Sequence, residues 1–192
     1  MITRKITYFE RCGRRNTEET LRLAKERADE LGVRDVVVAS TTGETGVKAC
    51  EIFKGFNVVV VTHSVGFRSP GINEFEEENR RRILEMGGRI FTGTHALSAV
   101  ERSVRRQLST WLPLELMANT LRIFGEGIKV AVEIAVMAAD AGLIPIDGEV
   151  IAIGGTGRGA DTAVVLKPAH STNFFDLEIR EIICKPRRII RS

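Results

Sequence analysis

Residues 36–46 read Val-Val-Val-Ala-Ser-Thr-Thr-Gly-Glu-Thr-Gly, a short β-branched run that passes directly into hydroxyl-bearing residues and glycines. A continuous apolar run without polar alternation predicts a strand covered on both faces, which is typical of the interior of a parallel sheet. The polar residues after it predict a tight loop at the carboxyl end of that strand. This stretch therefore indicates an α/β fold.

The same alternation continues on both sides of this stretch. The residues predict helices at 17–31, 47–53 and 73–86, the first of them ended by Gly32, and further strands at 58–61 and 89–91. Strands and helices that alternate at these spacings require right-handed crossovers and a parallel sheet with helices on both faces.

The second half of the chain predicts more helix and then the rest of the sheet. We expect a helix at 94–108 and a long apolar helix at 116–141, in which Gly125 and Gly127 predict a break or a close contact. Strands follow at 150–153 and 162–166, and the second of these could run antiparallel to the first. Apolar and polar residues alternate enough in the tail at 177–184 to predict a further edge strand. The prediction is one three-layer α/β domain over residues 1–192. Its mostly parallel sheet has five or six strands in the order 3-2-1-4-5.

Composition narrows the class of protein. The 192 residues are 43% hydrophobic and 28% charged, which is an ordinary globular balance, and a net charge of +3 does not favour nucleic-acid binding. Three scattered cysteines and the lack of a signal or membrane segment predict a cytoplasmic protein without disulfides. No metal-ligand spacing is visible. The basic residues cluster in two places, which we interpret as solvated surface: Arg102/Arg105/Arg106 and Lys185/Arg187/Arg188/Arg191.

Several predicted strands end in polar loops, and the carboxyl ends of parallel strands meet at the edge where α/β sheets bind ligands. The loop at 40–46 joins a strand to a helix, so its amides and the helix N-terminus are suited to a phosphate group. An ordinary βα turn with a threonine cap is the alternative. The candidate ligand-binding residues in this loop are Ser40, Thr41, Thr42, Gly43, Thr45 and Gly46.

The glycine-rich loop at 154–162 is the second candidate. It has no lysine at the position that a Walker loop requires, so it is not a Walker loop. Arg158 is suited to a bidentate phosphate contact. Asp161 could orient Arg158 or accept a hydrogen bond from a ligand hydroxyl. A glycine-rich hairpin with a solvated arginine is the alternative. The candidate residues in this loop are Gly155, Thr156, Gly157, Arg158, Gly159, Asp161 and Thr162.

Two histidines also follow predicted strands at this edge. His63 and His95 are candidates for ligand contact or for acid–base catalysis, with a structural hydrogen-bonding role as the alternative. The loop at 64–72 is longer than a turn requires, so Phe67 could cover a planar ring, with the loop acting either as a lid or as a plain connector.

These residues resemble the C-terminal α/β domain of pyruvate kinase, and more closely the stand-alone archaeal proteins of that fold. The similar segments are GRRNTEET at 13–20, VTH at 61–63, THALS at 94–98, LRIFGEG at 121–127 and GTGRGADT at 155–162. The resemblance implies that 40–45 and 154–162 match the two loops that hold an effector's phosphate in pyruvate kinase. It also implies an FMN site. The catalytic barrel of pyruvate kinase is absent, so kinase activity is not implied.

We therefore expect a protein that binds a phosphorylated small molecule, with FMN as the leading candidate. One alternative is a flavin-dependent oxidoreductase that uses His63 or His95 as proton donor. Another is a regulatory or structural domain that binds a sugar phosphate. A homo-oligomer is expected, without a nucleic-acid or membrane partner.

Overall fold

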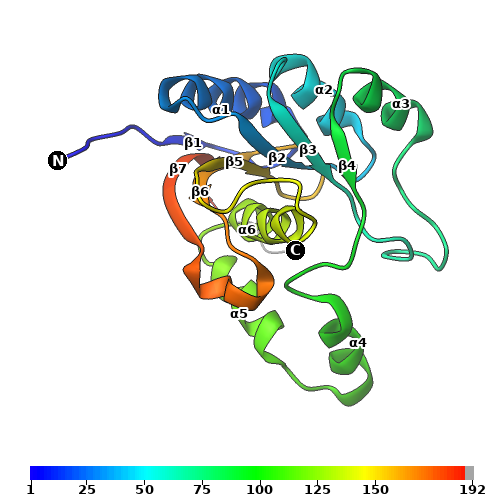
Figure 1. The fold of residues 1–192 in the computed structure, drawn as a ribbon. Coiled ribbons are helices and arrows are strands. Elements are labelled where there is room, and N and C mark those ends of the chain that lie inside the picture. Colours follow the sequence, from blue (N-terminus) through cyan, green and yellow to red (C-terminus); the bar gives the residue numbers. More distant parts are fainter. Residues whose placement is uncertain (189–192) are drawn as a thin grey trace.

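A seven-stranded sheet crosses the protein, with helices on both of its faces (Figure 1). The computed structural model describes residues 1–188, so Arg191 and its part in the second basic cluster lie outside the described residues. The strands are β1 (Thr7–Phe9), β2 (Asp35–Ala39), β3 (Asn57–Val61), β4 (Arg89–Phe91), β5 (Val150–Gly154), β6 (Thr162–Lys167) and β7 (Glu178–Pro186). The α-helices are α1 (Thr17–Leu31), α2 (Glu44–Ile52), α3 (Glu77–Glu85), α4 (Ala99–Leu108), α5 (Pro113–Leu121) and α6 (Glu126–Asp140), with short 3₁₀ turns at Arg14–Asn16 and Ser171–Asp176.

The strand order is β1-β7-β6-β5-β2-β3-β4. The five strands from β4 to β6 have the predicted order 3-2-1-4-5, and β6 runs antiparallel to β5. The predicted count of five or six strands is too low. The tail forms β7, which is not an edge strand, because β1 pairs with its last residues, Cys184–Pro186. A three-residue strand such as β1 carries too little pattern to be recognised in the sequence.

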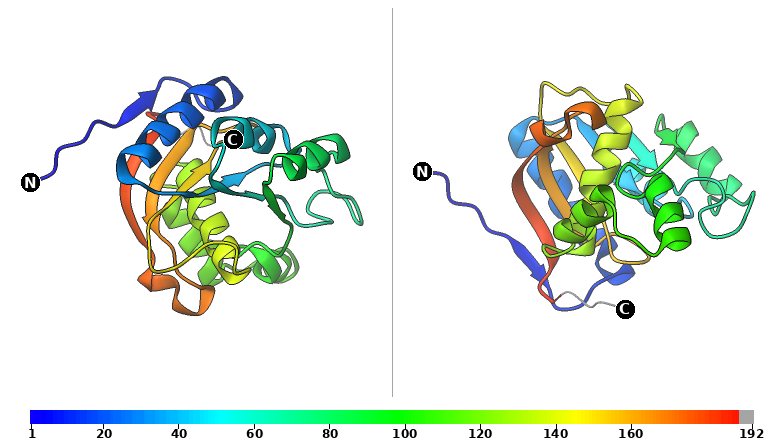
Figure 2. Two further views of the ribbon diagram at one scale, coloured as in Figure 1. Left: turned by 45° about the horizontal axis from the view of Figure 1, so that its top comes forward. Right: turned by 90° about the horizontal axis from the view of Figure 1, so that it is seen from below.

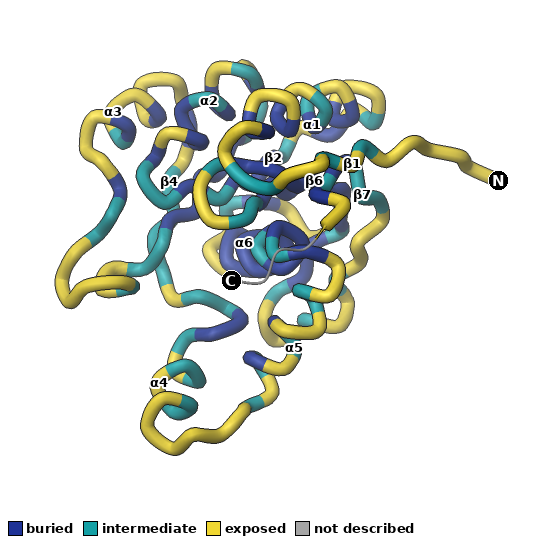
Figure 3. The backbone as a smooth tube through the Cα atoms, turned by 180° about the vertical axis from the view of Figure 1, so that it is seen from behind, coloured by how far each residue is buried: buried dark blue, intermediate teal, exposed yellow. Residues whose placement is uncertain are grey.

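Two hydrophobic layers cover the sheet. Helices α1, α2 and α3 lie on one face, and α6 lies across the other (Figures 1 and 2). Val36 and Val38 of β2 pack into the first layer, whereas Val37 packs into the second, because side chains alternate along a strand. Figure 3 shows α6 buried along most of its length, while α4 has no buried residue.

The predicted long helix at 116–141 is divided in two. Gly125 separates α5 from α6 with a φ of +135°, a conformation that glycine tolerates far better than other residues. Gly127 makes the predicted close contact, since a Cβ there would lie 2.1 Å from Thr162 Oγ1. The helices expected at 73–86 and 94–108 begin later, at Glu77 and Ala99.

Strand order reverses between β2 and β5. The chain runs outward through β2, β3 and β4, returns through α4, α5 and α6, and enters β5 on the opposite side of β2. Both strands point their carboxyl ends to the same edge, where ligands bind in sheets of this kind. None of the helices in residues 1–188 is long and apolar enough to span a membrane.

The close packing of α6 against β6 gives a stability prediction. Replacing Gly127 with Ala improves intrinsic helix propensity by about 1 kcal/mol, but the methyl group overlaps Thr162. We expect Gly127→Ala to lower the free energy of unfolding by about 1–3 kcal/mol in chemical denaturation. Gly148→Ala is the matched control, because its Cβ would meet no atom within 4 Å. Equal stabilities for the two variants would contradict the packing argument.

Candidate functional site

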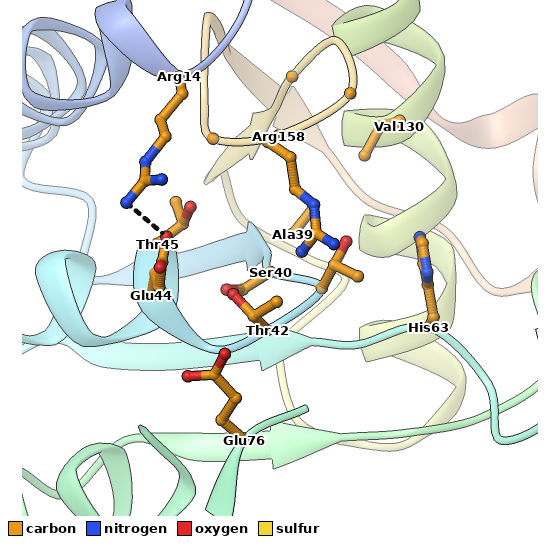
Figure 4. A pocket seen from close by; sticks show the side chains of 14 residues that line it. Arg14, Ala39, Ser40, Thr42, Glu44, Thr45, His63, Glu76, Val130 and Arg158 are labelled. Atoms are coloured by element: carbon orange, nitrogen blue, oxygen red, sulfur yellow. Dashed lines mark ion pairs between the residues drawn. The ribbon is translucent and has the colours of Figure 1, made fainter. Parts of the chain in front are cut away.

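A cavity of about 350 Å³ opens at the carboxyl ends of β2 and β5, where the strand order reverses (Figure 4). The two loops that the sequence analysis predicts to be neighbours do line this one cavity. The walls consist of Arg14, Ala39, Ser40, Thr41, Thr42, Glu44, Thr45, His63, Glu76, Val130, Gly155, Gly157, Arg158 and Gly159.

The loop between β2 and α2 is held by the hydroxyl of Ser40. Ser40 Oγ accepts hydrogen bonds from Gly43 N at 3.1 Å and from Gly46 N at 3.2 Å. These bonds fix the shape of the loop, so this oxygen has a structural role. Gly43 and Gly46 do not line the cavity. A Cβ on Gly43 would lie 2.5 Å from Asn79 Cβ, and one on Gly46 would lie 2.7 Å from Val60 Cγ1. These glycines let α2 pack closely against α3 and the sheet, which corrects their expected role in approaching an anion.

The first turn of α2 offers hydrogen-bond donors to the cavity. Within residues 1–188, the backbone N–H groups of Thr41, Thr42, Glu44 and Thr45 donate to no protein acceptor. The N-terminus of a helix also carries a partial positive charge. The loop therefore presents several amide donors and the threonine hydroxyls at the place where an anion is favoured.

Two arginines extend over this turn from different loops (Figure 4). Arg158 follows β5, and its Nη2 atom lies 3.9 Å from Glu74 Oε1. Arg14 precedes α1, and its Nη2 atom lies 3.0 Å from Glu44 Oε2. Sequence reasoning missed Arg14, because a basic residue ahead of a helix is usually solvated surface. Only the fold brings it to the cavity, as it does Glu76 and Val130, which were also missed, whereas Glu44 lies within the predicted loop at 40–46.

Asp161 has a structural role that differs from the predicted one. It is fully buried, and its carboxylate accepts hydrogen bonds from Gly13 N at 2.8 Å, Thr156 N at 3.2 Å and Thr162 Oγ1 at 2.8 Å. It makes no hydrogen bond with Arg158. Thr156, Asp161 and Thr162 do not line the cavity, and their hydrogen bonds shape the loop that carries Arg158.

A second cavity of about 140 Å³ adjoins the first one. The two share Ala39, Ser40, Thr41, His63 and Val130 in their walls. His95 and Phe67 line only the second cavity. The ring of Phe67 lies 4.1 Å from that of His63 and 4.9 Å from that of His95, measured between centroids. The predicted aromatic and imidazole groups therefore gather at this second cavity.

Each histidine pairs with a carboxylate. His63 Nδ1 lies 2.8 Å from Glu74 Oε2, and burial lowers the pKa of His63 although Glu74 opposes this shift. His95 Nδ1 lies 3.5 Å from Glu133 Oε2, which also pairs with Lys129. Burial alone would raise the pKa of Glu133, but the hydrogen bonds and charges of His95 and Lys129 outweigh it and lower the pKa to about 2.

The sequence also matches a protein family. A family model described as pyruvate kinase, alpha/beta domain, matches residues 18–166, a range that extends from α1 to β6. The match includes both loops that line the larger cavity, whereas Arg14 precedes it. The mostly parallel sheet with helices on both faces agrees with this assignment, and the chain belongs to the pyruvate kinase alpha/beta domain family.

Proposed function

We propose that this protein binds a phosphate-bearing small molecule at the carboxyl edge of the sheet, and that this molecule is FMN. One observation carries the proposal. The first turn of α2 and two guanidinium groups from separate loops surround a single cavity of about 350 Å³. This volume falls within the range of ordinary small-molecule pockets.

The polar end of the cavity suits a phosphate group. The unpaired amides at the start of α2 supply donors, and Arg14 and Arg158 supply positive charge above them. Glu44 and Glu74 partner these arginines. A guanidinium has five N–H donors, so each arginine can bind a phosphate oxygen while it keeps its carboxylate contact.

The opposite end of the cavity favours a flavin over a simple sugar phosphate. Val130 and His63 lie where the two cavities meet and offer an apolar and a planar surface. FMN carries a phosphate at one end and a planar ring system at the other, and its ribityl hydroxyls would pair with Thr41 and Thr42 between them. A sugar phosphate fills only the polar end, and it remains the alternative for a regulatory domain.

The proposal predicts that Arg158 recognises the phosphate rather than the flavin ring. Arg158→Ala should weaken FMN binding by roughly 10- to 100-fold, the loss expected for a charge-assisted hydrogen bond. Riboflavin lacks the phosphate, so the wild-type protein and Arg158→Ala should bind it with the same affinity. Quenching of flavin fluorescence measures all four dissociation constants.

Arg180→Ala is the control for this experiment. Arg180 lies on β7, pairs with Glu149 and Glu178, and borders neither cavity. FMN affinity that is unchanged in Arg158→Ala would contradict the proposed phosphate site. A wild-type protein that binds ribose 5-phosphate but neither flavin would favour the regulatory alternative.

The second candidate function is a flavin-dependent oxidoreductase. It is favoured by the two imidazoles that lie beside the junction of the cavities. Bound FMN would supply the hydride-accepting ring for NADH or NADPH, and His63 would deliver the proton that the reduced ring requires.

Anaerobic loss of flavin absorbance after addition of NADH or NADPH tests the oxidoreductase candidate. His63→Gln should slow this reduction by roughly 100-fold if the imidazole relays the proton. His170→Gln is the control, since His170 is half-exposed and pairs with Asp140 away from both cavities. A wild-type protein whose bound FMN neither cofactor reduces would leave binding as the function.

A further inference from the structure

Arg102, unlike the nearby Arg105 and Arg122, has no carboxylate partner. Arg105 pairs with Glu115 at 2.7 Å, and Arg122 pairs with Glu126 at 2.7 Å. Within residues 1–188, no carboxylate oxygen lies within 4.0 Å of the Arg102 guanidinium. Its Cζ atom lies 4.6 Å from the centroid of the Phe67 ring instead. An aromatic ring can hold a guanidinium in place by a cation–π contact, but it does not neutralise the charge.

Arg102 is also partly withdrawn from water. The residue is only partly exposed and borders the smaller cavity. Burial lowers the pKa of Arg102, the charge of Arg106 adds to this effect, and Glu133 and Glu115 oppose it. Keeping a partly desolvated positive charge without an ion-pair partner costs folding free energy. A bound anion would compensate this cost, so Arg102 is suited to anion binding.

The charges around the smaller cavity leave a positive excess. Besides the two histidines, its walls contain three cations, Arg102, Arg122 and Lys129, and two anions, Glu126 and Glu133. Arg122 pairs with Glu126, and Lys129 pairs with Glu133. Among the described residues of this wall, Arg102 is therefore the cation without an ion-pair partner, and the cavity should attract a single negative charge.

The size and the apolar lining of the cavity restrict that anion. Its volume of about 140 Å³ is smaller than pockets for drug-sized ligands, which favours a small molecule of few heavy atoms. Val61, Ile134 and Met137 form an apolar part of the wall, which suits a short hydrocarbon chain. His63 bonds Glu74 through Nδ1, so its Nε2 atom can serve one further polar atom of the ligand, whereas both ring nitrogens of His95 already have protein partners in Glu133 and Ser64 N.

We propose that the smaller cavity binds a short-chain hydroxy or keto carboxylate, whose carboxylate pairs with Arg102 and whose carbon chain packs against Ile134 and Met137. The hydroxyl or keto oxygen lies toward His63 Nε2. This site is separate from the proposed phosphate site, because Arg14 and Arg158 border only the larger cavity. The inference does not require FMN. If FMN occupies the larger cavity, the acid lies next to it at the shared wall of His63 and Val130.

Calorimetric titration of the flavin-free protein with 2-hydroxybutyrate and 2-oxobutyrate tests this site. We expect Arg102→Gln to weaken binding of the better acid by roughly 10- to 100-fold, because a charge-assisted contact is lost. The neutral 2-hydroxybutyramide should bind weakly, and equally to both proteins. Arg106→Gln is the matched control. Arg106 is exposed on the same helix and does not border this cavity, so it should leave the affinity unchanged.

Two further measurements separate a binding role from a structural one. Arg102→Gln loses no ion pair but only the contact with Phe67, so this variant should unfold at nearly the same denaturant concentration as the wild-type protein. Arg158→Ala should reduce FMN affinity but leave the affinity for the acid unchanged. The two proposals can therefore fail independently.

Three results would overturn the proposal. The first is a wild-type protein that binds neither acid at millimolar concentration. The second is an Arg102→Gln variant that binds the acid as tightly as the wild-type protein. The third is competition by inorganic phosphate that depends on Arg102 and is as strong as that by either acid, since this would indicate a general anion site.

Discussion

The carboxylate of Asp161 joins the two segments that carry the arginines of the larger cavity, one ahead of α1 and one after β5. It is fully buried and accepts hydrogen bonds from the backbone N–H groups of Gly13, ahead of α1, and Thr156, after β5. A buried charge is tolerated only when hydrogen bonds replace the lost water, and these contacts do so. Arg14 follows Gly13 directly and Arg158 lies within the second loop, so one carboxylate brings both arginines to the same side of the sheet.

The close approach of α6 to the sheet positions the rest of the site. Gly127 contacts Thr162, and a Cβ on Gly154 would lie 2.5 Å from the carbonyl oxygen of Gly127, so the start of α6 rests against the ends of β5 and β6. One turn later α6 places Lys129 and Val130 at the cavities, and Glu133 follows at helical spacing. Larger residues at these two glycines would move the helix away and open both cavities.

The sequence supports the fold prediction because its strongest signals are local. The β-branched runs at 36–39, 58–61 and 150–153 each form a strand, and the switch point between β2 and β5 follows from their order. The break at Gly125 is also a local signal. The loops that bear Thr42 and Arg158 share a cavity because all these strands end at one edge.

The remaining features depend on contacts that are distant in the sequence, and this explains the errors. Asp161 is separated from Gly13 by 148 positions, so no spacing rule could show that its oxygens hold the loop instead of a ligand. The same applies to Arg14. The unpaired state of Arg102 is equally invisible in the sequence, where it stands in a basic cluster that is typical of solvated surface.

The arginines of the two cavities differ in whether a protein carboxylate contacts them, and this difference affects which anion each cavity prefers. In the larger cavity each arginine already contacts a glutamate, so a ligand there shares the guanidinium group with a protein carboxylate. A doubly charged phosphate is attracted to such a shared arginine more strongly than a single carboxylate is. In the smaller cavity no protein carboxylate shares Arg102, so a ligand with a single negative charge can pair with it.

His63 belongs to the walls of both cavities, and burial already lowers its pKa. A ligand that covers His63 from the larger cavity would desolvate the imidazole further, and one that donates a hydrogen bond to it would favour the same neutral form. Coupling between two sites is reciprocal, so occupancy of either cavity would change the affinity of the other through this one side chain.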